Sequence, residues 1–441
     1  MGRRRRRRLD LLTLIVLCLC LSLAMTRSRF YPVKIPQTSV AAADEIRGVW
    51  MTNVNSGVLF VPGGIPRALD QLSQLNFNTI YPVFWNRGTT FYRSAIARRV
   101  TGRFQDPLLN FSHLGKDVLS DIIGQGHQRG LRVIPWFEYG LMAPINSQLV
   151  QRHPEWITLP QSFKFSGVPS LQDLDDAVLL NYPPSNKFAG WFGIRNVWLN
   201  PLHPEVQRFI EDVIIEVVIK YDVDGIQFDD NFGMPIELGY DWYTRKIYKQ
   251  EHGGKLPPNN PADPEWMRWR ADKITAFMKH LHDRIKAVKP DCLISLAPNP
   301  REFAYNESLQ DWQTWVKRGL IEEFILQVYR DSPKAFIREL EDPAIREIRG
   351  KIPVGIGILS GTMGHAVDIE QIRQQVQEVR DREFQGISFF YWETLWSYFT
   401  PDAPRERRRV FEKLFSPAPS QRSAINSTEN SSSHPNISIK I

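Results

Sequence analysis

Val223-Asp224-Gly225-Ile226-Gln227-Phe228-Asp229-Asp230 reads as a short buried strand that ends in two carboxylates. From Gly225 onwards, small or polar residues alternate with bulky apolar ones, and side chains alternate between the two faces of a strand. In a parallel barrel the polar face lines the interior, so Asp229 is expected at the carboxyl end of the strand, pointing into the mouth. Asp230 then begins the loop. Barrel enzymes carry their chemistry at that end. A structural alternative is that one Asp caps the next segment or pairs with an Arg.

Seven similar apolar runs flank this stretch, and a helical pattern follows each of the eight. Pro204, Pro264 and Pro404 stand where helices begin. Gly130, Gly319 and Gly350 stand at helix ends, where a left-handed residue is favoured. The predicted strands are 46–54, 78–85, 131–138, 223–230, 292–298, 323–329, 354–359 and 386–392, and the predicted helices are 66–75, 116–129, 204–220, 264–288, 309–318, 333–347, 369–383 and 404–415. This alternation predicts an α/β fold, a (β/α)8 TIM barrel. Long βα-loop insertions are expected at 89–115, 141–202 and 231–263, and such loops usually build a cleft.

The two ends of the chain differ from the predicted barrel at 45–415. Residues 1–44 begin with a run of six Arg and continue with an apolar stretch, which indicates an export signal followed by a linker. Cleavage near Ala41 and an uncleaved anchor in the inner membrane both remain open. Either way, the body is expected outside the cytoplasm, in the periplasm or beyond the cell. Residues 416–441 are rich in Ser and Asn and poor in apolar residues, so this tail is expected to be disordered.

Charge and composition exclude several other functions. Six of the 55 Lys and Arg residues are Arg3 to Arg8, which leaves 49 basic against 48 acidic residues, so no nucleic-acid partner is predicted. Cys292 is the one cysteine of the body, which excludes a disulfide framework. Neither a phosphate-binding loop nor a zinc-ligand spacing occurs in the sequence. We therefore predict neither a cofactor nor a metal.

The residues at the predicted strand ends are rich in carboxylates, amides and aromatics. Glycoside hydrolysis uses two carboxyl groups that flank the scissile bond, one protonated and one ionised. Asp229 is the first candidate for the ionised carboxylate, as nucleophile or as the group that stabilises the developing cation. Asp230 is predicted either to orient Asp229 or to hold an acetamido group of the substrate.

Two glutamates are candidates for the protonated acid. Glu138 ends a run with two aromatic neighbours, and apolar surroundings disfavour the charged form of a carboxyl group. Glu393 has a similar setting, although strand alternation places it on the outward face unless the strand ends first. For both residues a structural ion pair with a loop arginine, such as Arg87 or Arg195, is the alternative.

Amide and aromatic side chains at the same strand ends suit sugar recognition. Amides hydrogen bond with hydroxyl groups, and aromatic faces stack on pyranose rings. Packing in the core remains the alternative for the tryptophans. The predicted substrate-binding residues are Asn53, Trp85, Asn86, Tyr139, Asn299, Gln327, Tyr329 and Trp392.

Four motifs, in this order along the chain, resemble the bacterial glycosyl-hydrolase-like family ten. They are 45–50 (EIRGVW), 77–88 (FNTIYPVFWNRG), 200–206 (NPLHPEV) and 221–230 (YDVDGIQFDD). The resemblance covers about 45–415 and implies a barrel glycosidase of the cell envelope; one group in the family hydrolyses peptidoglycan glycan strands at the divisome. It adds Asn200 to the expected binding residues. Many members have Asn at the position of Glu138, so the acid role of Glu138 comes from its neighbours in this sequence.

The sequence therefore predicts an exported glycoside hydrolase that acts on a polysaccharide, with peptidoglycan glycan strands as one candidate substrate. The alternative is a non-catalytic barrel of the envelope that binds polysaccharide and tolerates loss of its carboxylates. A cytosolic sugar-metabolising enzyme would leave the N-terminal segment unexplained.

Overall fold

The computed structural model describes residues 45–163, 167, 169–174, 195–396 and 400–416. Parallel strands close into a barrel, because β1 pairs with β14 on one side and with β2 on the other. Around the barrel the order is β1, β14, β11, β10, β9, β8, β5 and β2. The strands are β1 (Ile46–Met51), β2 (Thr79–Asn86), β5 (Trp136–Glu138), β8 (Gly225–Asp229), β9 (Leu293–Ala297), β10 (Glu323–Gln327), β11 (Val354–Leu359) and β14 (Gly386–Phe390). The predicted TIM barrel is confirmed.

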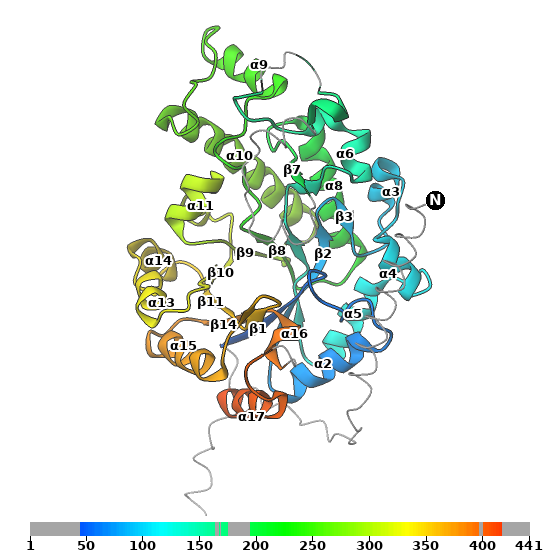
Figure 1. Cartoon of the computed structure of the whole chain (residues 1–441), viewed down its shortest axis with the longest axis vertical. Coiled ribbons are helices and arrows are strands. Elements are labelled where there is room, and N and C mark those ends of the chain that lie inside the picture. The colour runs from blue at the N-terminus through cyan, green and yellow to red at the C-terminus, as the bar shows by residue number, and fades with distance from the viewer. Residues whose placement is uncertain (1–44, 164–166, 168, 175–194, 397–399, 417–441) are drawn as a thin grey trace, which may run out of the picture.

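Helices surround the strands (Figure 1). The outer helices are α2 (Gly64–Gln74), α5 (Val118–Gln128), α8 (Pro204–Lys220), α10 (Pro264–Val288), α12 (Trp312–Lys317), α13 (Pro333–Leu340), α14 (Pro343–Arg349), α15 (Ile369–Asp381) and α17 (Pro404–Phe415). The helices predicted from Pro204, Pro264 and Pro404 begin at those residues.

The predicted N-terminal signal segment and the Ser/Asn-rich tail lie outside the described residues. Among the described helices, none is both long enough and apolar enough to cross a bilayer.

Three local predictions need correction. The third strand is broken into β4 (Arg132–Val133) and β5, because Pro135 has no N–H to donate to the sheet. The predicted helix 333–347 is two helices, since the Asp342 carboxylate accepts the Ala344 N–H at 2.6 Å and starts α14 anew. Gly350 is right-handed, with φ −74°. The Lys351 and Ile352 N–H groups both reach the Ile348 carbonyl, so the helix ends without a left-handed residue.

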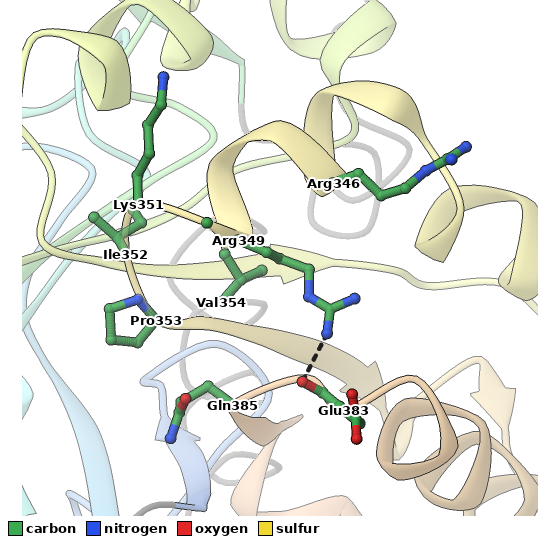
Figure 2. Close-up of a pocket in the computed structure, with 9 residues that line it drawn as sticks. Arg346, Arg349, Lys351, Ile352, Pro353, Val354, Glu383 and Gln385 are labelled. Atoms are coloured by element: carbon green, nitrogen blue, oxygen red, sulfur yellow. Dashed lines mark hydrogen bonds between the residues drawn. The ribbon is translucent and has the colours of Figure 1, made fainter.

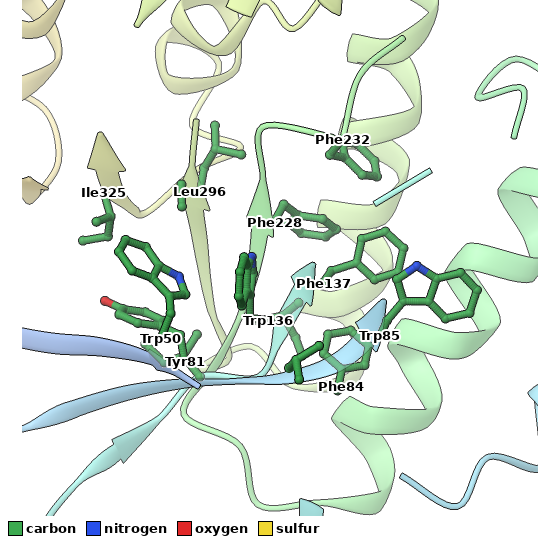
Figure 3. Close-up of a cluster of buried hydrophobic side chains, with 14 of the residues drawn as sticks. Trp50, Tyr81, Phe84, Trp85, Trp136, Phe137, Phe228, Phe232, Leu296 and Ile325 are labelled. Carbon is green, nitrogen blue, oxygen red and sulfur yellow. The ribbon is translucent and has the colours of Figure 1, made fainter. Parts of the chain in front are cut away.

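Alternation along the strands separates two packed layers (Figure 3). Trp136 points into the barrel and contacts Trp50, at 6.2 Å between ring centroids. Its neighbour Phe137 points outward and packs on Phe84 and Phe228. The interior is thus filled below the mouth, as in other barrels of this kind, and a ligand can enter only above this layer.

The predicted insertions carry their own elements at the mouth. The first holds β3 (Thr89–Thr90), α3 (Ala95–Thr101) and α4 (Pro107–Ser112). The second holds β6 (Met142–Pro144), α6 (Gln148–Arg152), the 3-10 turn η1 (Pro154–Trp156) and β7 (Asn196–Trp198), and β6 pairs with β7. The third holds α9 (Trp242–Glu251). Shorter elements follow later strands at the same end: α11 (Arg301–Ser308), β12 (Gly361–Thr362), β13 (His365–Ala366) and α16 (Trp392–Leu395).

Candidate active site

The two carboxylates that end β8 have different environments. Asp229 is 1% exposed, and it accepts the N–H of Tyr139 at 2.7 Å and that of Asn231 at 2.9 Å. Asp230 is only half-buried and accepts side-chain amides, from Asn299 at 2.8 Å and Gln327 at 3.3 Å. Asp229 therefore braces the loops after β5 and β8, while Asp230 is the member of the pair that solvent or a ligand can reach.

Burial acts on both acids of this pair. It raises the pKa of Asp229 well above its ordinary value, and the neighbouring Asp230 charge raises it further. Burial also raises the pKa of Asp230, against the lowering effect of the Gln327 and Asn299 amides. Two adjacent carboxyl groups in low dielectric resist carrying two charges, so they favour sharing one proton.

Glu138 ends β5, beside the Asp pair. It is 2% exposed, and Thr52 Oγ1 lies 2.6 and 2.8 Å from its two carboxyl oxygens. Burial raises the pKa of Glu138 to about 7; Thr52, Asn86 and Arg87 lower it, and the Asp230 charge raises it. No ion pair joins Glu138 to a cation within the part of the chain that the structure describes. The predicted alternative, an ion pair with Arg87, is thus not formed, and burial shifts Glu138 toward its protonated form.

Glu393 occupies a different part of the mouth. Its Oε1 accepts the Val58 N–H at 3.0 Å and contacts the Ser56 hydroxyl, so it holds the loop after β1. Burial raises the pKa of Glu393 to about 7, as for Glu138. Since β14 ends at Phe390, the strand alternation that would place Glu393 outward does not extend to it. Among the described residues, no hydrogen bond links Glu393 to Glu138 or to the Asp pair.

Several predicted binding residues gather around the Asp pair and Glu138. Asn86 donates to Asn53 Oδ1 at 2.8 Å. Asn299 and Gln327 hold Asp230, as described above. Tyr329 stacks on Phe390 with 5.7 Å between ring centroids, and burial raises its pKa, as do the charges of Asp230, Asp229 and Glu138. Tyr139 has a left-handed backbone (φ 55°), and Arg87 lies 4.5 Å from its ring centroid.

Other predicted binding residues are placed in the core. Trp85 is 0% exposed, stacks on Phe137 and donates to the Gly140 carbonyl at 2.8 Å. The prediction that it stacks on a sugar is wrong, because it lies on the outward face of β2, toward α8. Asn200 is also buried, and its amide donates to Asp241 at 3.0 Å inside the loop layer, so it is structural. Trp392 is buried, 6.3 Å from Trp396 between ring centroids.

Sequence reasoning did not include Thr52 in the site, although the signal was present. Trp50 points inward, where its indole donates to Gln227 Oε1 at 2.7 Å. Thr52 lies two positions further on and shares that face, just past the end of β1. Arg87 appeared only as a structural partner for a glutamate; its place over Tyr139 depends on its left-handed backbone (φ 47°), which residue type alone does not reveal.

An open cavity of about 450 Å³ lies at the opposite end of the barrel (Figure 2). It adjoins Val354 at the start of β11 and Gln385 just before β14, so it is remote from the carboxylates. Arg349 lines it and donates to the Glu383 carbonyl at 2.7 Å. This cavity therefore contains none of the candidate catalytic carboxylates, which lie at the mouth. In the described part of the chain, no group of three His, Cys, Asp or Glu residues is arranged to hold a metal ion.

The sequence profile of the glycosyl hydrolase-like 10 family matches residues 45–167 and 186–379. The chain belongs to this family. The match includes β1 to β11 and contains Glu138, Asp229 and Asp230. Together with the barrel, family membership supports a carbohydrate-active enzyme of the glycoside hydrolase class.

Two curated relatives are distant. The chain is 24% identical over 346 residues to the protein named glycosyl hydrolase DigH from Escherichia coli K12, covering 67% of this chain and 68% of DigH. It is 24% identical over 331 residues to glycosyl hydrolase YngK from Bacillus subtilis 168, covering 68% of this chain and 57% of YngK.

Solved structures share the fold. The glycoside hydrolase domain of PgaB (BpsB) from Bordetella bronchiseptica superposes with a TM-score of 0.58 at 13% identity, over 83% of this chain and 98% of that domain. The catalytic domain of β-amylase from Paenibacillus polymyxa has a TM-score of 0.51 at 8% identity, over 85% and 99%. At these identities the likeness concerns the barrel alone.

Proposed function

We propose that this protein is an exported glycoside hydrolase that cleaves a polysaccharide, with peptidoglycan glycan strands as the first substrate to test. One observation carries the proposal: Glu138 and the Asp229–Asp230 pair share one cluster at the barrel mouth, in which Glu138 and Asp229 are buried and Asp230 is half-buried. The protonated and ionised carboxyl groups that glycosidases require are thus close together. The family and the names of the relatives support the same reaction class.

The geometry suggests a division of roles. Glu138, with its pKa near 7, donates its proton to the glycosidic oxygen as the C–O bond breaks. Asp230, the accessible member of the pair, faces the anomeric carbon and stabilises its positive charge. Water then adds to that carbon, and its proton returns to Glu138. Asp229 positions Asp230 and the Tyr139 loop through its backbone hydrogen bonds.

Export is proposed from the sequence of residues 1–44 alone, with membrane anchoring through the apolar segment if it is not cleaved. A fusion of the chain to a reporter that is active only outside the cytoplasm tests this point. A reporter signal that survives replacement of Leu11 to Met25 by a polar linker would contradict it.

The direct test of hydrolysis uses the full chain and glycan strands stripped of their peptides. New reducing ends should appear with the wild type and should be lost with Asp230→Asn. Asp229→Asn should lose both activity and thermal stability, because the new amide would face the two N–H donors. If no reducing ends form, or both variants remain active, the proposal fails; unchanged binding isotherms without turnover would favour the polysaccharide-binding barrel.

A further inference from the structure

A second, smaller cavity lies among the mouth loops that follow β2 and β5. Its volume is about 240 Å³, and its lining includes the guanidinium-bearing Arg87 and Arg103 together with Thr89, Gln105 and Asn146. Among the described residues, neither Asp nor Glu contributes to this lining. The cavity is therefore polar and positive, unlike the mouth, where the charged groups are mostly acids.

Arg87 connects this cavity to the active-site cluster. Its Nε donates to Asn86 Oδ1 at 3.1 Å, and its guanidinium carbon lies 4.5 Å from the centroid of the Tyr139 ring. A guanidinium has five N–H donors in a planar fork. In the described part of the chain no carboxylate forms an ion pair with Arg87 or Arg103. Donors on both arginines are thus available to a ligand, and a carboxylate matches them in geometry and charge.

Gln105 adds a second, independent indication of a ligand. The residue is 3% exposed, and its Nε2 donates to Asn110 Oδ1 at 3.2 Å. Its Oε1 is buried and has no hydrogen-bond partner among the described residues. Because a buried acceptor without a donor costs free energy, a ligand that also carries a hydroxyl or amide N–H fits this cavity better than a bare anion.

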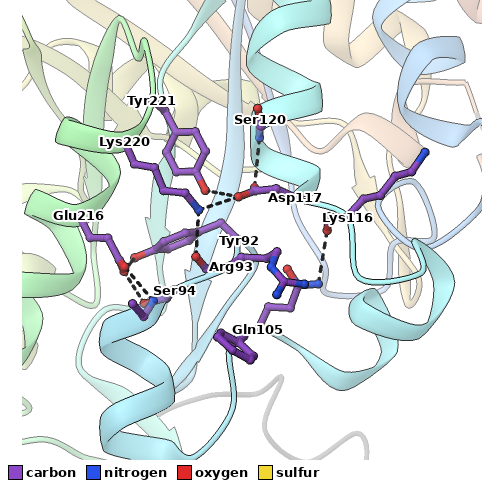
Figure 4. Close-up of polar contacts among 12 residues, drawn as sticks. Tyr92, Arg93, Ser94, Gln105, Lys116, Asp117, Ser120, Glu216, Lys220 and Tyr221 are labelled. Carbon is purple, nitrogen blue, oxygen red and sulfur yellow. Dashed lines mark hydrogen bonds and ion pairs between the residues drawn. The ribbon is translucent and has the colours of Figure 1, made fainter.

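The cavity wall is held in place before any ligand binds (Figure 4). Tyr92 and Ser94, which lie between the two stretches that line the cavity (87–90 and 97–105), both donate to Glu216 of α8, at 2.9 and 2.5 Å. On the inner side, the Thr90 hydroxyl donates to the Phe104 carbonyl at 3.0 Å, and the Asp106 N–H donates to the Thr90 carbonyl at 2.9 Å. The segment that carries Arg103 and Gln105 is thus pre-organised, which reduces the entropy lost on binding.

We propose that this cavity is a substrate subsite for a sugar unit that carries a carboxylate, so that the enzyme prefers acidic glycans to neutral ones. Arg87 and Arg103 bind the carboxylate, and Gln105 accepts a hydrogen bond from a hydroxyl or acetamido group of the same unit. This assignment rests on the proposed glycosidase site and names the class of substrate for it.

Calorimetric titration of the full chain with two matched ligands tests the assignment. One ligand is a peptide-free glycan-strand oligosaccharide with its lactyl carboxylates intact, and the other is the same oligosaccharide after reduction of those carboxylates to alcohols. The wild type should bind the acid form at least about tenfold more tightly, the effect expected of one charge-assisted hydrogen bond. Arg103→Gln should weaken binding of the acid form about tenfold and leave the reduced form unchanged.

Arg338→Gln is the matched control, since Arg338 is an exposed arginine on α13 with a side chain 75% exposed. It should bind both ligands as the wild type does. Equal wild-type affinity for the two ligands, or the same loss from Arg103→Gln with both, would overturn the subsite. Selective binding of the acid form without any new reducing ends would instead overturn the proposed hydrolysis and leave the subsite standing.

Discussion

Each end of the barrel contains a buried glutamate, and the two glutamates differ in their hydrogen-bond and ion-pair partners. At the closed end, Glu323 begins β10 and accepts from Arg132 at 2.7 Å, from Ser295 at 3.1 Å and from Tyr81 at 3.2 Å. At the mouth, Glu138 is equally buried, but its nearest donor is the neutral hydroxyl of Thr52. One glutamate has a cation as its partner, and the other does not.

The difference separates a structural acid, Glu323, from a candidate general acid, Glu138. A carboxylate beside a guanidinium forms an ion pair, which fixes the strands around it. A carboxyl group that is desolvated without a cation shifts toward its protonated form, which is what a general acid near neutral pH requires. Burial alone therefore does not identify the catalytic candidate. The absence of a directly paired cation leaves Glu138 and Glu393, and of these two it is Glu138 whose pKa is also raised by the charge of Asp230.

Replacement of the accessible acid should have the largest effect. Asp230→Asn removes the carboxylate that we propose to stabilise the anomeric carbon, and we expect kcat to fall by about 10³-fold, the upper end of the range for loss of electrostatic stabilisation at a reacting centre. The thermal midpoint should stay close to that of the wild type, because among the described residues only side-chain amides, and no backbone N–H of another residue, donate to the Asp230 carboxylate. Steady-state release of reducing ends and a melting curve measure both; substantial residual activity would show that Asp230 is not the reacting carboxylate.

Replacement of the proposed acid comes next. Glu138→Gln should lower kcat by roughly 10²-fold to 10⁴-fold, the usual contribution of a general acid. In the wild type, kcat/KM should fall as the pH rises through about 7, because Glu138 then loses the proton that it donates. The variant should lack this basic limb. If the limb persists unchanged in Glu138→Gln, another group carries the proton.

Replacement by Gln should change the free energy of unfolding in opposite directions at the two glutamates: it should rise above pH 7 for Glu138 and fall for Glu323. The folded-state pKa of Glu138 lies near 7, above its ordinary value of 4.5. Its contribution is therefore fully present below about pH 4.5 and is lost as the pH rises to about 7, a loss of about 3 kcal/mol. Glu138→Gln should remove this loss, so above pH 7 the variant should have a higher free energy of unfolding than the wild type.

Glu323→Gln is the matched change at the closed end. It leaves Arg132 without its partner and should lower the free energy of unfolding by about 1–3 kcal/mol, less than for a fully buried pair because Arg132 is 41% exposed. Activity per folded molecule should be retained. Denaturant unfolding at pH 5 and pH 8 measures the free energy of unfolding of Glu138→Gln and Glu323→Gln. A higher free energy of unfolding for Glu323→Gln than for the wild type at pH 8 would contradict the proposed difference between the two glutamates.

The smallest effect on activity is expected from replacing Thr52, whose hydroxyl donates a hydrogen bond to Glu138. The Thr52 hydroxyl lowers the pKa of Glu138, so Thr52→Val should move the basic limb of the pH–rate profile to higher pH. Thr52→Ser keeps the hydroxyl and should leave the limb in place. A shift of the same size in both variants would point to a packing effect rather than to the hydrogen bond.

Asp229 and Trp85 show which side-chain positions can be predicted from the sequence and which cannot. Alternation along 223–230 correctly placed Asp229 at a strand end that faces inward, since a strand has a fixed period of two. Trp85 was expected to stack on a sugar because it stands at a predicted strand end. That expectation failed because β2 carries a register irregularity between Val83 and Trp85, which residue types do not reveal. The preference for Asp229 over Asp230 could not be tested from sequence either, since it depends on which N–H groups the neighbouring loops supply.

The sequence by itself determined the barrel, because apolar runs alternating with amphipathic segments bury their faces in a parallel α/β fold, and eight such units are the number that closes a TIM barrel. It also determined which strands end in acids. Only the tertiary structure decided what each acid does. Protonation and access depend on neighbours far apart in the chain, and it is folding that brings Thr52 to Glu138, Arg132 to Glu323 and Arg87 to the cavity beside the mouth.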